Sequence, residues 1–497
     1  MNAGRRAGPS KWGITRTGHR GGRWAALLSG AAGLSFLVAT GGVSGGAPAT
    51  ETSPTVAFQN GDGIAVTSEV QANPRLINMT VSTPAVAGTL HVDVLLPTNY
   101  NPAKRYPVLY LFHGTAGTAS DWVNFGQVEK TTAGLPLIVV MPDASLNDNG
   151  GSWCSDWVNQ SAGAANWETF HIDELIPWIE ANLPTIADRQ GRAIAGLSMG
   201  GFCSTSYAAL FPDLFETVLG FSPAPDIAYD KQAQAGAAFI IGATEVAENH
   251  VTPTSIFGDP LTDDINWAAH DPTTLAENLA DTNILLFNGN GLPGPLDPSP
   301  VTDPASLEGY PGAGLIEGAV DFDTTLFHNR LDALGISSSW DNYGNGTHSW
   351  PYWTRDLRQS IGTVMADFAN PLPNPSKVTY TTASADYTIY GWQVSMHRTA
   401  EEFSTIEDAD SSGFKLAGSG SGLVVTPAVY TPGRTHDVTI TEENAPPVVE
   451  KLRAGSTGAL HITVPLGPAN PYQEYTAQGD AAGKKVYTTT VSIAPAT

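Results

Sequence analysis

One serine of the chain lies in a pattern that is typical of a nucleophile. Ser198 is the central residue of Gly196-Leu197-Ser198-Met199-Gly200, which satisfies G-x-S-x-G. The strand-like run "RAIAG" precedes it and the helical stretch "GGFCSTSYAALF" follows it. At a strand-to-helix turn, small neighbours let the backbone bend sharply, so the hydroxyl stands clear of the chain. The helix N-terminus beneath favours developing negative charge, and we predict that Ser198 is a catalytic nucleophile.

A serine hydroxyl needs a base near neutral pH. In chains with this motif the histidine comes last in order, in a loop after the final strand. Among the 11 histidines, His348 in "GNGTHSWPYW" fits best, since it follows "SSSWDNY" and precedes the terminal helix. The other candidates lie too early or in a C-terminal region of different pattern: His270, His328, His397, His436 and His461. We therefore predict His348 as the general base.

Acyl transfer also needs two backbone N–H groups that bind the oxyanion. One is expected from Met199, the residue after the nucleophile. The second should follow the strand "YPVLYLFHG", at Thr115 in "HGTAG". His113 in the same motif is predicted to shape this loop and to belong to the substrate-binding site rather than to catalyse.

The acid that orients the histidine is harder to place. A position just after the strand "NILLFNGNG" favours Asp297 or Asp303. Position alone does not separate these two residues from Glu308 and Glu317, so the four candidates stay open at this point.

The elements that must position these residues alternate between strands and helices. Antiparallel strands are expected at about 55–100, and continuous apolar runs then end in Gly, Pro or Asp, as parallel strands buried on both faces do. These runs lie at 106–114, 136–143, 192–196, 216–223 and 283–291. Helical apolar stripes lie between two of them, at 172–183, and after Pro351. The pattern predicts an α/β-hydrolase fold, a mostly parallel sheet with helices on both faces.

The apolar period changes to two beyond the proline-rich segment "NPLPNPSK". Short alternating runs separated by Gly/Pro-rich turns predict an all-β, sandwich-like domain. We predict a signal peptide at 1–49, a catalytic domain at 50–370, a linker at 371–376 and a C-terminal β-sandwich domain at 377–497.

The first 49 residues have the pattern of an export signal. Six basic residues precede a small-residue apolar run, and Ala47-Pro48-Ala49 offers a cleavage point. An uncleaved membrane anchor is the alternative. Cleavage leaves 18 basic against 48 acidic residues, a net charge of −30, which argues against nucleic acid or an anionic lipid surface as a partner.

In an exported chain the only two cysteines, Cys154 and Cys203, are expected to form a disulfide, with free buried thiols as the alternative.

Several segments together resemble the antigen 85 family of secreted mycolyltransferases and the wider esterase D group. They are "GLSMGG", "MPDASLNDNGGSWCSDW", "FGDPLTDDINWAAHDPTTLAENLADTNILLFNGNG", "GLIEGAV" and "GTHSWPYW", within about 75–370. The resemblance implies Glu317 of "LIEG" as the acid and Trp350 as a substrate-binding residue at the edge of an acyl-donor site. It also implies acyl transfer from a glycolipid ester to trehalose or a related alcohol, with water as a competing acceptor.

The chain departs from that family at the oxyanion loop. The family has Asp-Gly-Leu-Arg where this chain has His113-Gly114-Thr115-Ala116, a form more like ordinary esterases of the wider group. The Asp and Arg that shape the sugar end of the family's pocket are therefore missing. The C-terminal β region is also absent from the best-known members.

We therefore expect a secreted or cell-envelope serine acyltransferase or esterase that acts as a monomer. It would move a mycolyl-like acyl group from an ester to a sugar, glycerol or water, without stable membrane insertion. A secreted carboxylesterase acting on small or polymeric esters is one alternative, and a non-catalytic cell-wall binding protein on a hydrolase scaffold is another. No zinc or phosphate motif stands out, and we expect neither a metal nor a cofactor.

Overall fold

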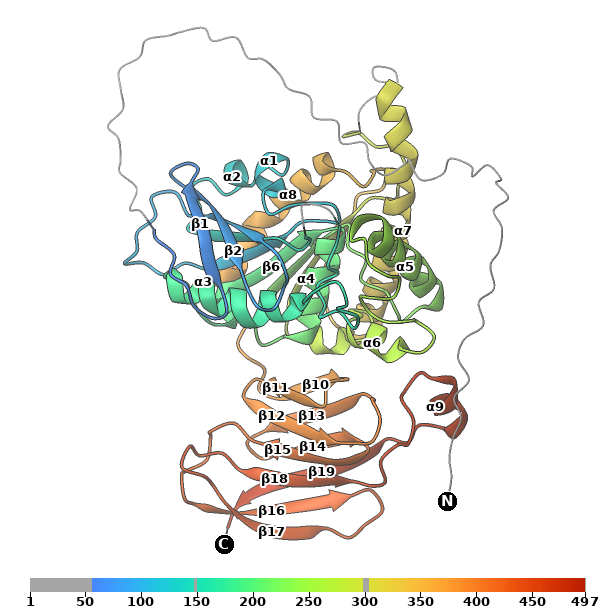
Figure 1. Ribbon diagram of the computed structural model, residues 1–497. Coiled ribbons are helices and arrows are strands. Elements are labelled where there is room, and N and C mark those ends of the chain that lie inside the picture. The colour runs from blue at the N-terminus through green and yellow to red at the C-terminus, as the bar shows by residue number, and fades with distance from the viewer. Residues whose placement is uncertain (1–55, 147–149, 298–303, 497) are drawn as a thin grey trace, which may run out of the picture.

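The strands in the described part of the chain form three sheets (Figure 1). The computed structural model describes residues 56–146, 150–297 and 304–496. The predicted signal peptide at 1–49, with its Ala47-Pro48-Ala49 site, lies outside these residues. Among the described residues, no helix has the length and apolar character required to cross a membrane.

The largest sheet has nine strands in the order β1-β2-β3-β5-β4-β6-β7-β8-β9. Strands β1 to β3 are antiparallel, and all pairs from β5–β4 to β8–β9 are parallel. The strands are β1 (Ala65–Gln71), β2 (Leu76–Ser82), β3 (Leu90–Leu95), β4 (Val108–Phe112), β5 (Ile138–Pro142), β6 (Arg192–Leu197), β7 (Thr217–Phe221), β8 (Asn283–Asn288) and β9 (Ser339–Asn342). The apolar runs expected as parallel strands are β4 to β8.

Helices cover both faces of this sheet (Figure 1). They are α1 (Asp121–Asn124), α2 (Val128–Thr131), α3 (Ile176–Asn182), α4 (Met199–Leu210), α5 (Lys231–Ala243), α6 (Asp264–Ala269), α7 (Pro304–Leu334) and α8 (Trp350–Ala369). Short π-helical and 3₁₀ turns connect them: η1 (Thr169–Leu175), η2 (Arg189–Gly191), η3 (Thr244–Glu248) and η4 (Ala276–Leu279). The apolar stripe expected at 172–183 is divided between η1 and α3.

Strand β4 shows why the sheet must be covered twice. Tyr110 and Phe112 belong to the apolar core that includes Trp178 of α3 and Phe202 of α4. Leu109 and Leu111 point to the opposite core, which includes Trp353 and Leu357 of α8. Because successive strand residues face opposite sides, a continuous apolar run requires helices on both faces. The chain therefore has the α/β-hydrolase fold, with separate antiparallel sheets near its C-terminus.

The C-terminal strands form a six-stranded sheet, β10-β13-β14-β19-β16-β17, and a four-stranded sheet, β11-β12-β15-β18. Their bounds are β10 (Val378–Thr382), β11 (Asp386–Ile389), β12 (Trp392–His397), β13 (Ser404–Asp410), β14 (Gly413–Gly418), β15 (Gly420–Val425), β16 (Thr435–Glu442), β17 (Val448–Arg453), β18 (His461–Leu466) and β19 (Tyr487–Pro495). A short helix, α9 (Ala477–Ala482), precedes β19. Alternating apolar residues from both sheets share one buried core.

Specific hydrogen bonds join these sheets to the α/β part, below which they lie in Figure 1. The Tyr380 hydroxyl donates to the Leu210 carbonyl at the end of α4 (2.8 Å). The Asn278 side chain accepts from the Thr381 N–H and donates to its carbonyl, both at 2.9 Å. The C-terminal sheets are therefore held against the end of α4 that lies away from Ser198.

Candidate active site

Ser198 lies at a sharp bend between β6 and α4. Its backbone has φ 54° and ψ −122°, a conformation that costs a non-glycine residue about 1–3 kcal/mol and is concentrated at functional sites. The flanking glycines are required, because a Cβ at Gly196 would lie 2.2 Å from the Gly200 carbonyl oxygen. A Cβ at Gly200 would lie 2.4 Å from the His113 carbonyl oxygen. The G-x-S-x-G motif thus forms a bend that leaves the serine half-buried at the carboxyl edge of the sheet.

The ends of three neighbouring strands bring the site together. The Ser198 N–H donates to the Phe221 carbonyl of β7 (2.9 Å), and the Ser222 N–H donates to the Phe287 carbonyl of β8 (2.7 Å). Ser198 and Ser222 are therefore adjacent at the sheet edge, one strand spacing of about 4.8 Å apart. Gly289 follows β8 in the same row.

Glu317 of α7 is held at this row and pairs with His348. Its side chain is 0% exposed, and one carboxylate oxygen lies 2.7 Å from His348 Nδ1. The other oxygen accepts from the Ser222 hydroxyl (2.9 Å) and from the Gly289 N–H (2.7 Å). Three hydrogen bonds thus fix the carboxylate, and it is placed to orient the imidazole.

The His348 ring is fixed from a second direction. It packs edge-on against Trp353 of α8, with ring centroids 4.9 Å apart, and Trp353 Nε1 donates to the Ser222 hydroxyl (3.0 Å). With Nδ1 turned to Glu317, Nε2 faces the other way; it is buried and has no hydrogen-bond partner among the described residues. No hydrogen bond joins it to Ser198 in this structure, and such contacts are often long in free enzymes. The pairing of Ser198 with His348 stays a prediction.

The structure separates the acid candidates. Asp297 accepts from the Thr347 hydroxyl, from the Tyr352 hydroxyl (3.0 Å) and from the Gly294 N–H (2.7 Å). It therefore anchors the chain on either side of His348 without bonding to the imidazole. Asp303 and the side chain of Glu308 lie outside the described part of the chain. The carboxylate that contacts His348 is that of Glu317 on α7, and not that of Asp297 in the loop after β8.

The two residues expected to supply oxyanion N–H groups lie close to the nucleophile. A Cβ at Gly114 would lie 3.2 Å from Ser198 Cβ, so the backbone next to Thr115 passes directly beside the serine. A Cβ at Gly151 would lie 2.6 Å from Met199 Sδ and 2.9 Å from Thr115 Cγ2. One short segment therefore packs against both residues, and their roles as oxyanion donors remain predictions.

His113 lies under the oxyanion loop. It is 1% exposed, its Nε2 accepts from the Ala144 N–H (2.8 Å), and its Nδ1 lies 2.7 Å from the Gly114 carbonyl oxygen. Burial beneath the loop leaves no surface for a substrate. The prediction of a substrate-binding role for His113 is therefore wrong, and the residue shapes the loop.

Trp350 lies at the wall of a pocket on the α8 side of the site. Its ring contacts Trp122, Phe125 and Trp353, with centroids 5.2 to 5.6 Å apart. The pocket has a volume of about 890 Å³, and its wall also includes Tyr343, Tyr352, Arg355 and Arg358. Contact between Trp350 and a substrate stays a prediction.

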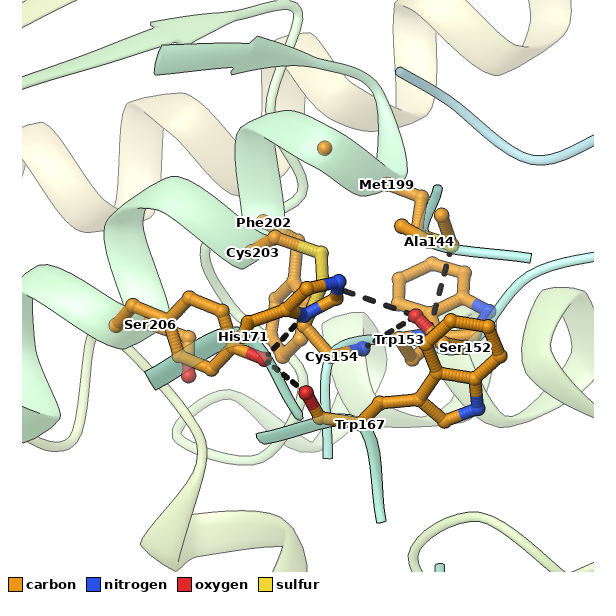
Figure 2. The surroundings of a disulfide bond; sticks show 12 residues. Ala144, Ser152, Trp153, Cys154, Trp167, His171, Met199, Phe202, Cys203 and Ser206 are labelled. Atoms are coloured by element: carbon orange, nitrogen blue, oxygen red, sulfur yellow. Dashed lines mark hydrogen bonds between the residues drawn. A yellow bond between two sulfur atoms is a disulfide. The ribbon is translucent and has the colours of Figure 1, made fainter. Parts of the chain in front are cut away.

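A disulfide ties the segment over the oxyanion residues to the helix that follows the nucleophile. Cys154 and Cys203 are bonded, with Cα atoms 5.4 Å apart, and Figure 2 shows the bond beside Met199. The Trp153 N–H donates to Met199 Sδ (3.4 Å) in the same view.

Nearby His171 is buried, which lowers its pKa to about 4, and it lies between Tyr207 and the Asp143 carbonyl as a neutral core residue. Among the described residues, no group of three or more His, Cys, Asp or Glu could hold a metal ion.

Three site residues escaped the sequence interpretation. Ser222 lies near the end of the apolar run at 216–223 and directly after β7, just as Ser198 lies directly after β6, so its position at the sheet edge could have been inferred. Trp353 lies in the apolar stripe expected after Pro351, and it also donates a hydrogen bond to Ser222. Asn249 bonds to Gly151, and nothing in its sequence context distinguishes it.

The fold and this site define an α/β-hydrolase with a serine at the nucleophile bend and a Glu–His pair beside it. Residues 83–364 match the model of a protein family described as "Putative esterase". The match covers more than half of the chain. The chain therefore belongs to this esterase family.

Several relatives come from mycobacteria. The chain is 36% identical to the esterase Rv1288 of Mycobacterium tuberculosis over 233 residues, which are 46% of this chain and 49% of that protein. It is 29% identical to the diacylglycerol acyltransferase/mycolyltransferase Ag85B of Mycobacterium leprae, over 44% of this chain and 63% of that protein. The chain thus spans about half the length of Rv1288. The structure of M. tuberculosis MPT51 (FbpC1) matches with a TM-score of 0.46 at 22% identity, over 58% of this chain and 96% of that one.

Proposed function

We propose that this protein is a serine esterase that forms an acyl-enzyme on Ser198, with His348 as the base and Glu317 as its orienting acid. The observation that carries the proposal is the 2.7 Å contact between Glu317 and His348, at the strand edge that holds the Ser198 bend. The buried, unpartnered Nε2 of His348 supports it, since a polar atom left without a partner costs free energy unless a substrate or nucleophile uses it.

The proposed reaction has two steps. His348 Nε2 takes the hydroxyl proton as Ser198 Oγ attacks the ester carbonyl, and the carbonyl oxygen becomes an oxyanion that the Thr115 and Met199 N–H groups bind. The C–O bond to the leaving alcohol then breaks, and the alcohol takes the proton from His348. Water or a second alcohol attacks the acyl-serine through the same base and regenerates the free hydroxyl.

Acyl transfer to an alcohol is the second candidate, and it rests on the relatives. Ag85B is named a diacylglycerol acyltransferase/mycolyltransferase, and the motifs around Ser198, Glu317 and His348 resemble that family. Trp350, two residues after His348, lines a pocket of about 890 Å³ that offers a candidate place for the acyl group of the donor. A mycolyl-like donor and a sugar or glycerol acceptor therefore form the finer proposal.

We further propose that the protein acts outside the cytoplasm as a monomer. The basic and apolar pattern of residues 1–49 supports export. The Cys154–Cys203 disulfide supports an oxidising compartment, where such bonds persist.

One experiment tests both the esterase proposal and the acyl-transfer proposal. The purified protein is incubated with a trehalose-ester glycolipid, with and without free trehalose or glycerol, and the products are identified by mass spectrometry. Free fatty acid that Ser198→Ala does not release supports the esterase proposal, and the same release by that variant contradicts it. New acylated trehalose or glycerol supports transfer, whereas free acid alone at saturating acceptor contradicts transfer and leaves hydrolysis.

A further inference from the structure

Asn249, which follows η3, makes an unusual contact with the segment beside the oxyanion residues. Its Oδ1 accepts from the Gly151 N–H (3.0 Å), and its Nδ2 donates to the Gly151 carbonyl (2.8 Å). A side-chain amide carries one acceptor and two donors, so it can pair with a peptide unit as a neighbouring strand would. The Asn249 backbone is itself fixed, because its N–H donates to the Thr244 carbonyl (2.8 Å).

Gly151 and Gly150 transmit this contact to the oxyanion residues. The Gly150 carbonyl accepts from the Ala116 N–H (2.7 Å), and Ala116 directly follows Thr115. On its other side Gly151 lies so close to Thr115 and Met199 that a Cβ would approach their side chains to 2.9 and 2.6 Å. Displacement of this segment would therefore move the two predicted N–H donors relative to each other.

Glycine is required on the Asn249 side of the segment as well. Gly150 has φ 103°, and a Cβ there would lie 2.0 Å from Asn249 Oδ1. Two glycines thus let the segment pass between Asn249 and the oxyanion residues at backbone contact distance. The rest of the segment is attached elsewhere, through the Ser152 N–H to the Ala144 carbonyl and through the Cys154–Cys203 bond. Asn249 accordingly fixes the part that contacts Thr115 and Met199.

We propose that Asn249 is a positioning residue for the oxyanion hole: its amide holds Gly151 and thereby fixes the separation of the Thr115 and Met199 N–H groups. The proposal rests on the esterase function proposed above. Complete removal of one oxyanion donor costs about 10²–10³ in kcat in other serine hydrolases, and a donor that is only misplaced should cost less. We expect Asn249→Ala to lower kcat about tenfold with KM within about twofold.

Asn249→Asp should be more damaging than Asn249→Ala, although it conserves the size of the side chain. A carboxylate accepts from the Gly151 N–H but repels the Gly151 carbonyl, and it places negative charge beside a site where an oxyanion develops. The repulsion of the Gly151 carbonyl also costs stability, so the kcat values of the two variants are compared at equal folded fraction, where the charge beside the oxyanion should make Asn249→Asp the slower enzyme.

Asn278 provides a control, since its side chain pairs with both backbone groups of Thr381 at the junction with the C-terminal sheets and also donates to the Ala209 carbonyl (2.9 Å). Asn278→Ala should lower the melting temperature at least as much as Asn249→Ala and leave kcat within about twofold of the wild type. Each variant is assayed where circular dichroism shows it to be folded.

The discriminating readout is inhibition by a trifluoromethyl ketone, which forms a tetrahedral adduct whose oxyanion occupies the hole. We expect its Ki to rise about tenfold in Asn249→Ala and further in Asn249→Asp, and to stay at the wild-type value in Asn278→Ala. Equal kcat and Ki in Asn249→Ala and Asn278→Ala would overturn the proposal, and so would an Asn249→Asp variant more active than Asn249→Ala. Activity that survives in Ser198→Ala would instead overturn the proposed function itself.

Discussion

Exchange of Glu317 for glutamine should nearly abolish ester hydrolysis, because the amide forces the wrong protonation state on His348. The glutamine oxygen accepts hydrogen bonds from the Ser222 hydroxyl and the Gly289 N–H, as the Glu317 oxygen does. These two bonds keep the oxygen on the side away from His348. The amide NH₂ then faces His348 Nδ1, which must accept, so its proton moves to Nε2. In that tautomer Nε2 cannot take the proton of the serine hydroxyl.

The size of the effect follows from the lost contacts. Restoring the productive tautomer requires the amide to turn, which breaks the bonds to Ser222 and Gly289 at about 1 kcal/mol each. The charge-assisted bond that stabilises the imidazolium contributes about 1.5–3 kcal/mol more. A total of about 3.5–5 kcal/mol corresponds to a loss of about 400- to 5,000-fold in kcat. The corresponding Asp-to-Asn exchange in a Ser-His-Asp triad costs about 10⁴-fold.

The assay is release of p-nitrophenol from p-nitrophenyl acetate by the wild type, Glu317→Gln and Asp321→Asn. Asp321 is the matched control, because it lies one turn further along α7 and bonds to Asn288 and Asn342 rather than to His348. Asp321→Asn should stay within about threefold of the wild type. A Glu317→Gln variant within tenfold of the wild type would refute the assigned role.

Three further predictions concern stability. Cys154→Ala/Cys203→Ala should lower the free energy of unfolding by about 4 kcal/mol, since the bond closes a chain separation of 49 residues, and urea unfolding that matches the wild type would contradict this. Burial and the nearby aspartates raise the pKa of Asp323 to about 8, so its contribution to stability falls as pH rises from about 4 to 8. The melting temperature of Asp323→Asn should therefore rise relative to that of the wild type as pH increases over this range. A difference in melting temperature that does not change with pH would refute the raised pKa of Asp323. Tyr380→Phe removes the donor to the Leu210 carbonyl and should cost about 1 kcal/mol by urea unfolding without loss of kcat, and an unchanged midpoint would argue against that contact.

The parts of the site that depend on local backbone geometry could be predicted from the sequence. The bend at Ser198 follows from glycines that leave no room for a Cβ, and the parallel strands follow from apolar runs that are buried on both faces. The disulfide between Cys154 and Cys203 was also within reach, because the chain has only two cysteines.

The parts that depend on long-range packing could not be derived from the pattern. Asp297 and Glu317 both follow β8, and only the path of α7 decides which of them meets His348. The resemblance to the antigen 85 family pointed to Glu317, whereas the residues alone left the choice open. The burial of His113 depends on the fold of the loop above it. The sequence alone therefore did not exclude a contact between His113 and a substrate. Asn249 contacts a segment nearly 100 residues earlier, and no local signal marks such a contact.

Covalent labelling of the nucleophile tests the central claim most directly. The protein is treated with a fluorophosphonate or a slowly hydrolysed ester, digested, and sequenced by mass spectrometry. We predict one adduct, on the peptide that contains Ser198, and no adduct in the Ser198→Ala protein. An adduct on a different residue, or ester hydrolysis that continues after Ser198 is fully modified, would contradict the account.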